Sequence, residues 1–386
     1  MAVVRVPVEP SLLTWAADRS GVDRGSLEKR FPKLEDWEAG QLDPTFNQLQ
    51  DFASATHAPL GFLFLTDPPD ESLPIPDFRT LKNSGVRRPS PDLLDTIYLC
   101  QIRQDWYREH AVAEGHDPLT FVGSVSIGDP VGPVADGIRK AIKFGLSERG
   151  KFSNSDDALR HLIDLIEDVG VLVMVSGIVG SNTHRGLDVE EFRGFALADA
   201  LAPLVFVNGA DTKAAQIFTL VHELVHIWSG ETALSDARMA RKVNNDGEEW
   251  ANQVAAEVLV PLSSIRAEYR QSVDASELER LAKVYKVSTL VVLKRIYDAG
   301  FLKWNPYRAR FKNELARIMV LVNARQQAGG GGNYYYTQPI RISRHFARAV
   351  IVDALEGRTL YRDAYQLLGA AKHETFQNLA TELGVR

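Results

Sequence analysis

Cysteine is almost absent from the sequence, which holds one such residue, Cys100. A single cysteine cannot form a disulfide within the chain, and it excludes zinc sites built from several cysteines. The longest apolar stretch, residues 169–180, is shorter than the roughly 20 residues that a membrane-spanning helix needs. The first residues include Arg5, Pro7 and Glu9, so they lack the apolar core of a secretory signal. We therefore expect a cytoplasmic protein with no membrane contact.

Acidic residues are scarce in one part of an otherwise acidic chain. The net charge is -6, but residues 301–350 hold nine Lys or Arg and one acid, Glu314. This segment carries +8 and the remainder -14. A basic stretch of this kind favours contact with an acidic protein or a nucleic acid. The alternative is that its arginines pair with acids of the same chain.

A motif for metal chemistry lies in a helix predicted over residues 213–228. That segment is apolar nearly all round, which is typical of a buried helix. It contains His222, Glu223 and His226 in the pattern H-E-x-x-H. Histidines four residues apart lie one turn apart on the same helix face, where they can share one metal ion. The motif predicts Zn²⁺ bound by His222 and His226, with Glu223 as the general base. The alternative is a chance match in which both histidines are ordinary core residues.

A third ligand is expected, because catalytic zinc takes three protein ligands and leaves one position open. The next predicted helix opens with acids, and taking Asp246 as its cap puts Glu249 at the position that turns back to the cap. Glu248 is then free to reach inward on the face shared with Asn252. We therefore predict Glu248 as the third ligand, with Glu249 second and Glu257 third.

These motifs resemble the ImmA/IrrE-like zinc metallo-endopeptidases. The resemblance is carried by FTLVHELVH at 218–226, by Glu248, Ala251, Asn252 and Ala255, by LVP at 259–261, by FRGF at 192–195, and by Pro203, Phe206, Val207 and Asn208. Residues 37–53 resemble the Xre-type helix-turn-helix family, and PIPDFRT at 74–80 matches a longer architecture of the same peptidases. The resemblance implies zinc held by His222, His226 and Glu248, with Glu223 as the base. Val254 departs from the family pattern, in which a larger apolar residue is usual.

The predicted fold class is α+β, a mainly helical chain of several domains. Short β-type runs at 171–175, 192–197 and 204–207 predict a zincin-like core, in which a small, mostly antiparallel sheet packs on the H-E-x-x-H helix. The predicted segments are a helix-turn-helix domain (1–70), a linker and helical region (71–165), the metallopeptidase core (166–262), a helical extension (263–304) and a basic helical region (305–386).

Charge argues against DNA reading by the first domain. Residues 1–65 hold six Lys or Arg and nine acids, a net of -3, whereas DNA affinity comes largely from neutralising phosphates. The expected recognition segment, 33–38, offers three acids and one lysine. DNA contact stays possible, but docking to a protein is favoured. A second helix-turn-helix-like pair at 276–301 is interpreted as packing against the core. The aromatic and basic residues at 333–348 suit RNA, DNA or protein equally.

The resemblance implies an endopeptidase that acts on a regulatory protein, often a repressor. The alternative is a transcriptional regulator or antitoxin that binds and neutralises a PIN-like nuclease toxin, with proteolysis secondary or absent. The sequence specifies neither the substrate nor its cleavage site, and the trigger and oligomeric state are equally unspecified.

Overall fold

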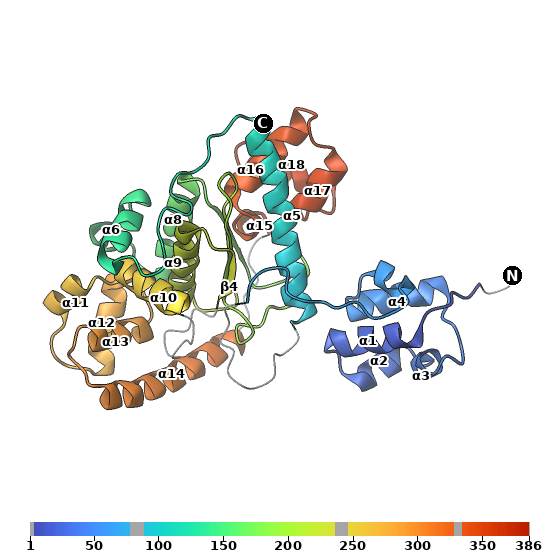
Figure 1. Cartoon of the computed structure of the whole chain (residues 1–386), viewed down its shortest axis with the longest axis horizontal. Helices are drawn as coiled ribbons and strands as arrows, with labels where there is room; N and C mark the ends of the chain where they lie inside the picture. Colours follow the sequence, from blue (N-terminus) through green and yellow to red (C-terminus); the bar gives the residue numbers. More distant parts are fainter. Residues whose placement is uncertain (1–3, 78–88, 236–245, 328–333, 386) are drawn as a thin grey trace. The chain divides into compact units, whose positions relative to one another are not determined.

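The computed structural model describes residues 4–77, 89–235, 246–327 and 334–385 (Figure 1). Contacts divide the chain into two compact units. The first comprises Met1–Pro74 and Gly85–Tyr98, and the second comprises Ile75–Ser84 and Leu99–Arg386. The finer division into five segments stays a prediction. In the part of the chain that is described, no helix is long and apolar enough to cross a membrane.

The regular elements are mostly helices. In the first unit and its return segment they are α1 (Pro10–Ser20), α2 (Arg24–Arg30), α3 (Leu34–Glu38), α4 (Phe46–Thr56), the 3-10 helix η1 (Leu60–Phe64) and α5 (Pro91–Ala113), which continues into the second unit. The second unit then contains α6 (Val131–Ala141), α7 (Leu146–Arg149), α8 (Ser155–Asp168), β1 (Leu172–Ser176), β2 (Gly194–Leu197), β3 (Leu204–Asn208), α9 (Lys213–Ser229) and β4 (Ala233–Ser235). It ends with α10 (Asp246–Leu259), α11 (Leu262–Glu268), α12 (Ala275–Tyr285), α13 (Thr289–Asp298), α14 (Trp304–Gln327), α15 (Tyr334–Ile342), α16 (Arg344–Leu355), α17 (Tyr361–Leu368) and α18 (His373–Glu382).

The first unit is held together by an aromatic core between short helices. Phe31, Trp37 and Phe52 pack with ring centroids 5.4 to 6.3 Å apart, and all three are buried. Helix α4 begins with a capping box in which Thr45 and Gln48 satisfy each other's backbone N–H groups. The predicted all-helical pattern of this region is what the structure shows.

A four-stranded sheet in the order β1-β3-β2-β4 forms the centre of the second unit. β2 pairs antiparallel with both β3 and β4, whereas β1 and β3 run parallel. The prediction of a mainly helical α+β chain with a small, mostly antiparallel sheet is confirmed. The strand β4 was not predicted from the sequence, because three residues are too few to show a periodic pattern.

Helix α9 packs against the sheet and between two other helices. It contacts β2 and β3 as well as α8 and α10, and residues 216–228 are all buried. The Thr212 side chain accepts a hydrogen bond from the backbone N–H of Ala215 and caps the helix start. Gly230 ends the helix at φ 74°, a left-handed conformation that glycine adopts without strain. Both ends of the helix are therefore fixed by local sequence.

The C-terminal end of α10 is held by three arginine side chains. Arg149 donates to the carbonyls of Phe144, Val258 and Leu259, and it is fully buried. Arg295 donates to the carbonyl of Val260, and Arg139 to that of Glu257. Positive charge at a helix C-terminus also complements the helix dipole. These contacts fix the helix that carries Glu248.

The last four helices, α15 to α18, pack on one another, and α15 contacts β1 at the edge of the sheet. Figure 1 shows α15 beside the sheet, with α16, α17 and α18 beyond it. Ser343, at φ 69°, caps the start of α16 through its hydroxyl. The Glu167 carboxylate at the end of α8 accepts from the backbone N–H of Arg344 at 3.1 Å. This buried carboxylate therefore joins α8, which packs against α9 and β1, to the C-terminal helices.

Candidate metal centre

Helix α9 brings the two motif histidines together. His222 and His226 lie one turn apart with their Nε2 atoms 3.1 Å from each other, and both side chains are buried. The rings meet nearly edge to face, at 70°. The predicted helical spacing therefore places both nitrogen atoms at one point.

Glu248, at the start of α10, reaches the same point. Its Oε2 lies 3.3 Å from Nε2 of His222, and its Oε1 lies 3.1 Å from Nε2 of His226. Glu249 is exposed to solvent, and Glu257 forms an ion pair with Arg295. Of the three acids considered from the sequence, the structure brings Glu248 to the histidines. Asp246 is the first residue of the helix, so the expectation that it is the cap places the boundary one residue late.

The chemistry of this trio fits a divalent cation. Neutral imidazole nitrogens and carboxylate oxygens are all electron-pair donors. Both Glu248 oxygens are buried and face the Nε2 atoms of the histidines, and neither has a backbone N–H or a hydroxyl as a hydrogen-bond donor among the described residues. Two ligand atoms about 2.1 Å from one tetrahedral ion lie about 3.4 Å apart. The observed separations of 3.1 to 3.3 Å are close to this value. Two histidines and one carboxylate form a typical catalytic zinc set that leaves a position open.

The protonation behaviour of the trio points the same way. Burial raises the pKa of the Glu248 carboxyl, but the two imidazoles outweigh burial and hold that pKa below its ordinary value. Burial lowers the pKa of His222. Burial also disfavours charge on His226, yet the Glu231 and Glu248 carboxylates outweigh it and raise the pKa of His226 to about 10. Without a metal, the trio therefore favours holding one proton. The same buried groups would be stabilised by the positive charge of a metal ion.

Glu223 lies beside this trio, between α9 and the sheet. It is fully buried, and burial raises the pKa of its carboxyl to about 8. Its Oε2 accepts a hydrogen bond from the Ser235 hydroxyl at 3.2 Å, whereas its Oε1 has no hydrogen-bond partner among the described residues. Strand β4 therefore positions Oε2, and Oε1 is available to accept a proton.

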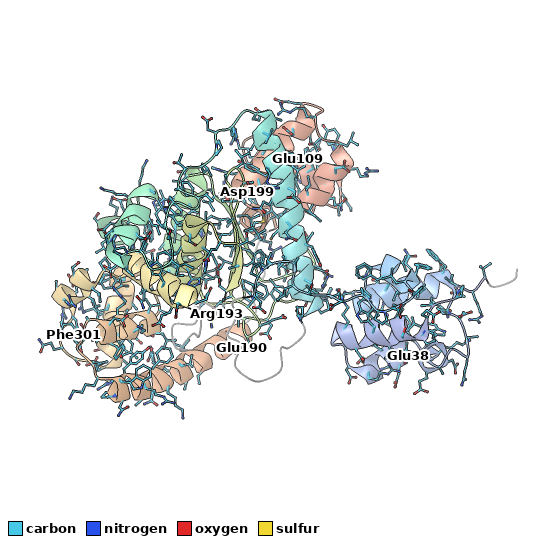
Figure 2. All side chains as sticks on the ribbon, viewed as in Figure 1. Glu38, Glu109, Glu190, Arg193, Asp199 and Phe301 are labelled. Atoms are coloured by element: carbon cyan, nitrogen blue, oxygen red, sulfur yellow. The ribbon has the colours of Figure 1, made fainter. Side chains whose placement is uncertain are left out.

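Strand β2 passes so close to Glu223 that one residue must be glycine. A Cβ atom on Gly194 would lie 2.9 Å from Oε1 of Glu223, 2.7 Å from a Thr219 methyl carbon and 2.8 Å from the Phe206 carbonyl oxygen. Gly194 and Ser235 are register partners in β2 and β4, so together they flank the carboxylate. Arg193, labelled in Figure 2, precedes β2 and forms an ion pair with Asp211 at 2.5 Å.

Two residues that were not predicted as functional contact the histidines from outside the trio. Oε2 of Glu231 lies 3.4 Å from Nδ1 of His226, and Asn252 interacts with His222. Partners on the far ring nitrogen fix the tautomer and the orientation of a ligating histidine. Asn252 could have been found from its helical position one turn beyond Glu248. Glu231 and Ser235 had no sequence signal, because they follow the end of α9 without a periodic pattern.

A second group of titratable side chains does not have the same character. His110, Glu114 and Asp353 also lie within 4.8 Å of one another. Arg358, however, pairs with Asp353 at 2.5 Å and with Glu114 at 3.0 Å. Because a guanidinium already neutralises this group, we interpret it as an ion-pair network.

The two helix-turn-helix-like pairs differ in what they expose. In α3 the side chains of Glu35 and Asp36 are exposed, and Glu38, labelled in Figure 2, forms an ion pair with Arg24. In contrast, none of the ten residues of α13 is exposed, because α11, α12 and α14 pack around it. Helix α13 is thus a core helix, as the packing interpretation of this pair expects.

The basic segment divides between internal pairs and free charges. Arg317 pairs with Glu314 and Glu279, Arg310 donates to the Val273 carbonyl, and Arg348 donates to the Leu383 carbonyl. Lys303, Arg308 and Lys312 are exposed, and no ion pair forms at them among the described residues. The Tyr334–Tyr336 side chains and Arg325 lie outside the described side chains. Contact of this segment with a partner stays a prediction.

Comparison with known families matches two stretches of the chain. Residues 342–382 match a domain of unknown function (DUF8813). Residues 166–297 match the peptidase family described as the IrrE N-terminal-like domain, and these bounds include α9, the sheet and α10. The comparison with curated proteins finds no match. The Xre-type assignment of residues 1–70 stays a prediction. The family match supports a metallopeptidase-type function and the resemblance to ImmA/IrrE peptidases, whose members are zinc-dependent in general.

Proposed function

We propose that the chain is a zinc-dependent endopeptidase in which His222, His226 and Glu248 hold the metal and Glu223 is the general base. The observation that carries this proposal is the meeting of three buried electron-pair donors within 3.3 Å, beside a carboxylate with one unpaired oxygen. A bound zinc ion supplies Lewis acidity for the attack of water on a peptide carbonyl.

In this proposal each residue has a separate task. Glu223 takes a proton at Oε1 while Ser235 holds Oε2, and it later delivers a proton to the leaving amine. Burial favours this exchange, because a carboxyl whose pKa is raised toward neutrality can both accept and release a proton. Glu231 orients the His226 imidazole from its Nδ1 side, and Asn252 interacts with His222.

We further propose that the substrate is a regulatory protein and that the first unit docks a protein instead of DNA. The exposed acids of α3 support protein docking, because they would repel a phosphate backbone. The burial of α13, the second helix of the pair at 276–301, argues against its use as a recognition helix. Binding of a nuclease-like partner without cleavage is the competing outcome.

The experiment measures metal content and peptide cleavage on the same samples. The full chain is incubated with a proteome-derived peptide library, cleavage is followed by mass spectrometry, and zinc is measured by elemental analysis. Glu223→Gln should retain one zinc per chain and lose cleavage by at least about 10²-fold. His222→Ala should lose both, and Glu249→Gln, an exposed acid on the same helix as Glu248, should lose neither. A wild-type chain that binds no stoichiometric zinc would refute the proposal.

A further inference from the structure

Strand β4 pairs with another strand of the described sheet along one edge. Its inner edge pairs with β2, and it is the last strand in the sheet order. The outer edge of such a strand presents backbone N–H and C=O groups that can pair with an extended chain. Because the Ser235 hydroxyl binds Glu223, a peptide added along β4 would lie beside the general base.

This outer edge is covered by the chain itself. The backbone N–H of Leu234 donates to the Pro76 carbonyl at 2.9 Å, and Asp77 forms a parallel bridge with Leu234. Ile75, just before, is 5% exposed. By its contacts this stretch belongs to the second unit, although it follows directly on Pro74, the last residue of the first continuous stretch of the first unit. We call Ile75–Asp77 the blocking segment.

The composition of the blocking segment makes it a weak strand partner. Pro76 has no backbone N–H and therefore cannot donate a hydrogen bond to a neighbouring strand. Pro74, two residues earlier, lacks this donor as well. The segment runs parallel to β4, and the backbone N–H of Leu234 donates to its Pro76 carbonyl. A peptide without proline could form more hydrogen bonds along the same edge. The segment can thus cover the edge and still be displaced.

We propose that Ile75–Asp77 is an autoinhibitory strand that occupies the edge of β4 on which an extended peptide substrate binds. This inference rests on the proposed peptidase function, and it adds the mode of substrate binding and its control. The substrate enters as an extended, proline-poor segment, and it must displace Pro76 from Leu234 before its scissile bond reaches Glu223. In the chain, the blocking segment directly follows the first unit, which we propose as a docking domain.

The test weakens the segment and measures peptide binding as well as cleavage. Ile75→Ser removes the buried side chain of the segment in the full-length protein. Leu65→Ser makes the same chemical change at an exposed position and is the matched control. Pro76→Gly keeps the carbonyl but loosens the backbone, and it provides a second variant if Ile75→Ser does not fold. Zinc content and thermal midpoint check that each variant is intact.

Cleavage of the peptide library should rise at least about threefold in kcat/KM for Ile75→Ser, mainly through a lower KM, and should not change for Leu65→Ser. The same substitutions in a Glu223→Gln background should increase the retention of library peptides by a similar factor, which is measured without catalysis. Equal retention in the presence and absence of Ile75→Ser, in folded protein, would overturn the blocking role. Increased retention without cleavage by any variant would support the blocking role and refute the peptidase function, so the two proposals fail separately.

Discussion

The two ends of helix α10 both bury charge, but they do so in opposite ways. At the C-terminal end, guanidinium groups of Arg149 and Arg295 donate to backbone carbonyls, so donor faces acceptor. At the N-terminal end, the Glu248 carboxylate meets the Nε2 atoms of His222 and His226, and acceptor faces acceptor. Both ends are closed to solvent.

The difference separates a structural contact from a binding site. A buried charge that is fully hydrogen-bonded stabilises a fold when it is intact and costs much when one partner is removed. A buried set of acceptors is unfavourable until a proton or a metal ion joins it. The C-terminal end thus holds α10 in place, and the N-terminal end uses that rigidity to present Glu248. The following predictions test this distinction.

Arg149→Met should have the largest effect on stability. It leaves the carbonyls of Phe144, Val258 and Leu259 buried without this donor, and the free energy of unfolding should fall by about 3–5 kcal/mol. Urea unfolding followed by circular dichroism measures the change. Arg160→Met, which removes an exposed arginine paired with Asp156, should cost less than about 1 kcal/mol. Similar losses in the two variants would contradict the structural role of Arg149.

Glu167→Gln tests a third buried group, the carboxyl of α8 that accepts a hydrogen bond from the start of α16. Burial raises the pKa of the Glu167 carboxyl to about 7, so the folded chain binds a proton that the unfolded chain has released above its ordinary value of 4.5. The wild-type chain should therefore lose stability as pH rises from about 4.5 to 7, and glutamine removes this loss. Relative to wild type, the variant should gain about 3 kcal/mol by pH 8 and little at pH 4.

The measurement is urea unfolding at several pH values. Asp164 and Tyr107 lie near Glu167 and titrate in both proteins, so the difference between wild type and variant isolates Glu167. A difference that is independent of pH would mean that the pKa of Glu167 does not change on folding.

Glu248→Gln should have a smaller effect on the metal-free fold than Arg149→Met, in the same direction. The substitution removes the carboxylate that the two imidazoles stabilise and leaves the buried His226 without this partner, so the unfolding free energy measured with a chelator should fall by about 2 kcal/mol. Zinc affinity, measured by competition with a chelating dye, should fall at least about 10²-fold. A large loss of stability without metal would assign Glu248 a structural role.

Arg24→Ala should have the smallest effect. Arg24 pairs with Glu28 and Glu38 at the surface of the first unit, where its side chain is 44% exposed. Surface ion pairs contribute little, so the loss of stability should stay below about 1 kcal/mol and shrink further in high salt. A loss comparable to that of Arg149→Met would show that burial is not the cause of the contrast between buried and surface arginines.

The sequence was sufficient to predict the motif helix and the position of Glu248 beside the two histidines. Helical periodicity alone places His222 over His226, and the same periodicity puts Glu248 on the face of Asn252. It was not sufficient for Ser235 and Glu231, which reach Glu223 and His226 through a tertiary fold that brings a three-residue strand and a turn beside the helix. The need for glycine at position 194 also depends on a close approach between β2 and α9 that no local pattern encodes.

The two helix-turn-helix-like pairs show the same limit. Their helices were predictable from the spacing of apolar residues and from the residues that break helices, but this spacing does not say which helix faces solvent. Helix α13 is covered by α14, whose first residues begin only after the turn at Gly300 and Phe301. The acidic charge of α3 can be counted from the sequence alone. The burial of α13, in contrast, depends on α11 and α14, which lie outside the helix-turn-helix-like pair.

The bridge between Asp77 and Leu234 also bears on the order in which the chain folds during synthesis. The two residues are about 160 positions apart, so a ribosome adding about 5–20 residues per second needs on the order of ten seconds between them. The first unit can fold within this interval, whereas Ile75–Asp77 has no strand to pair with until β2, β3 and α9 have emerged. The segment therefore cannot guide the early assembly of the sheet, and a nascent chain completes strand β4 before its outer edge can be covered.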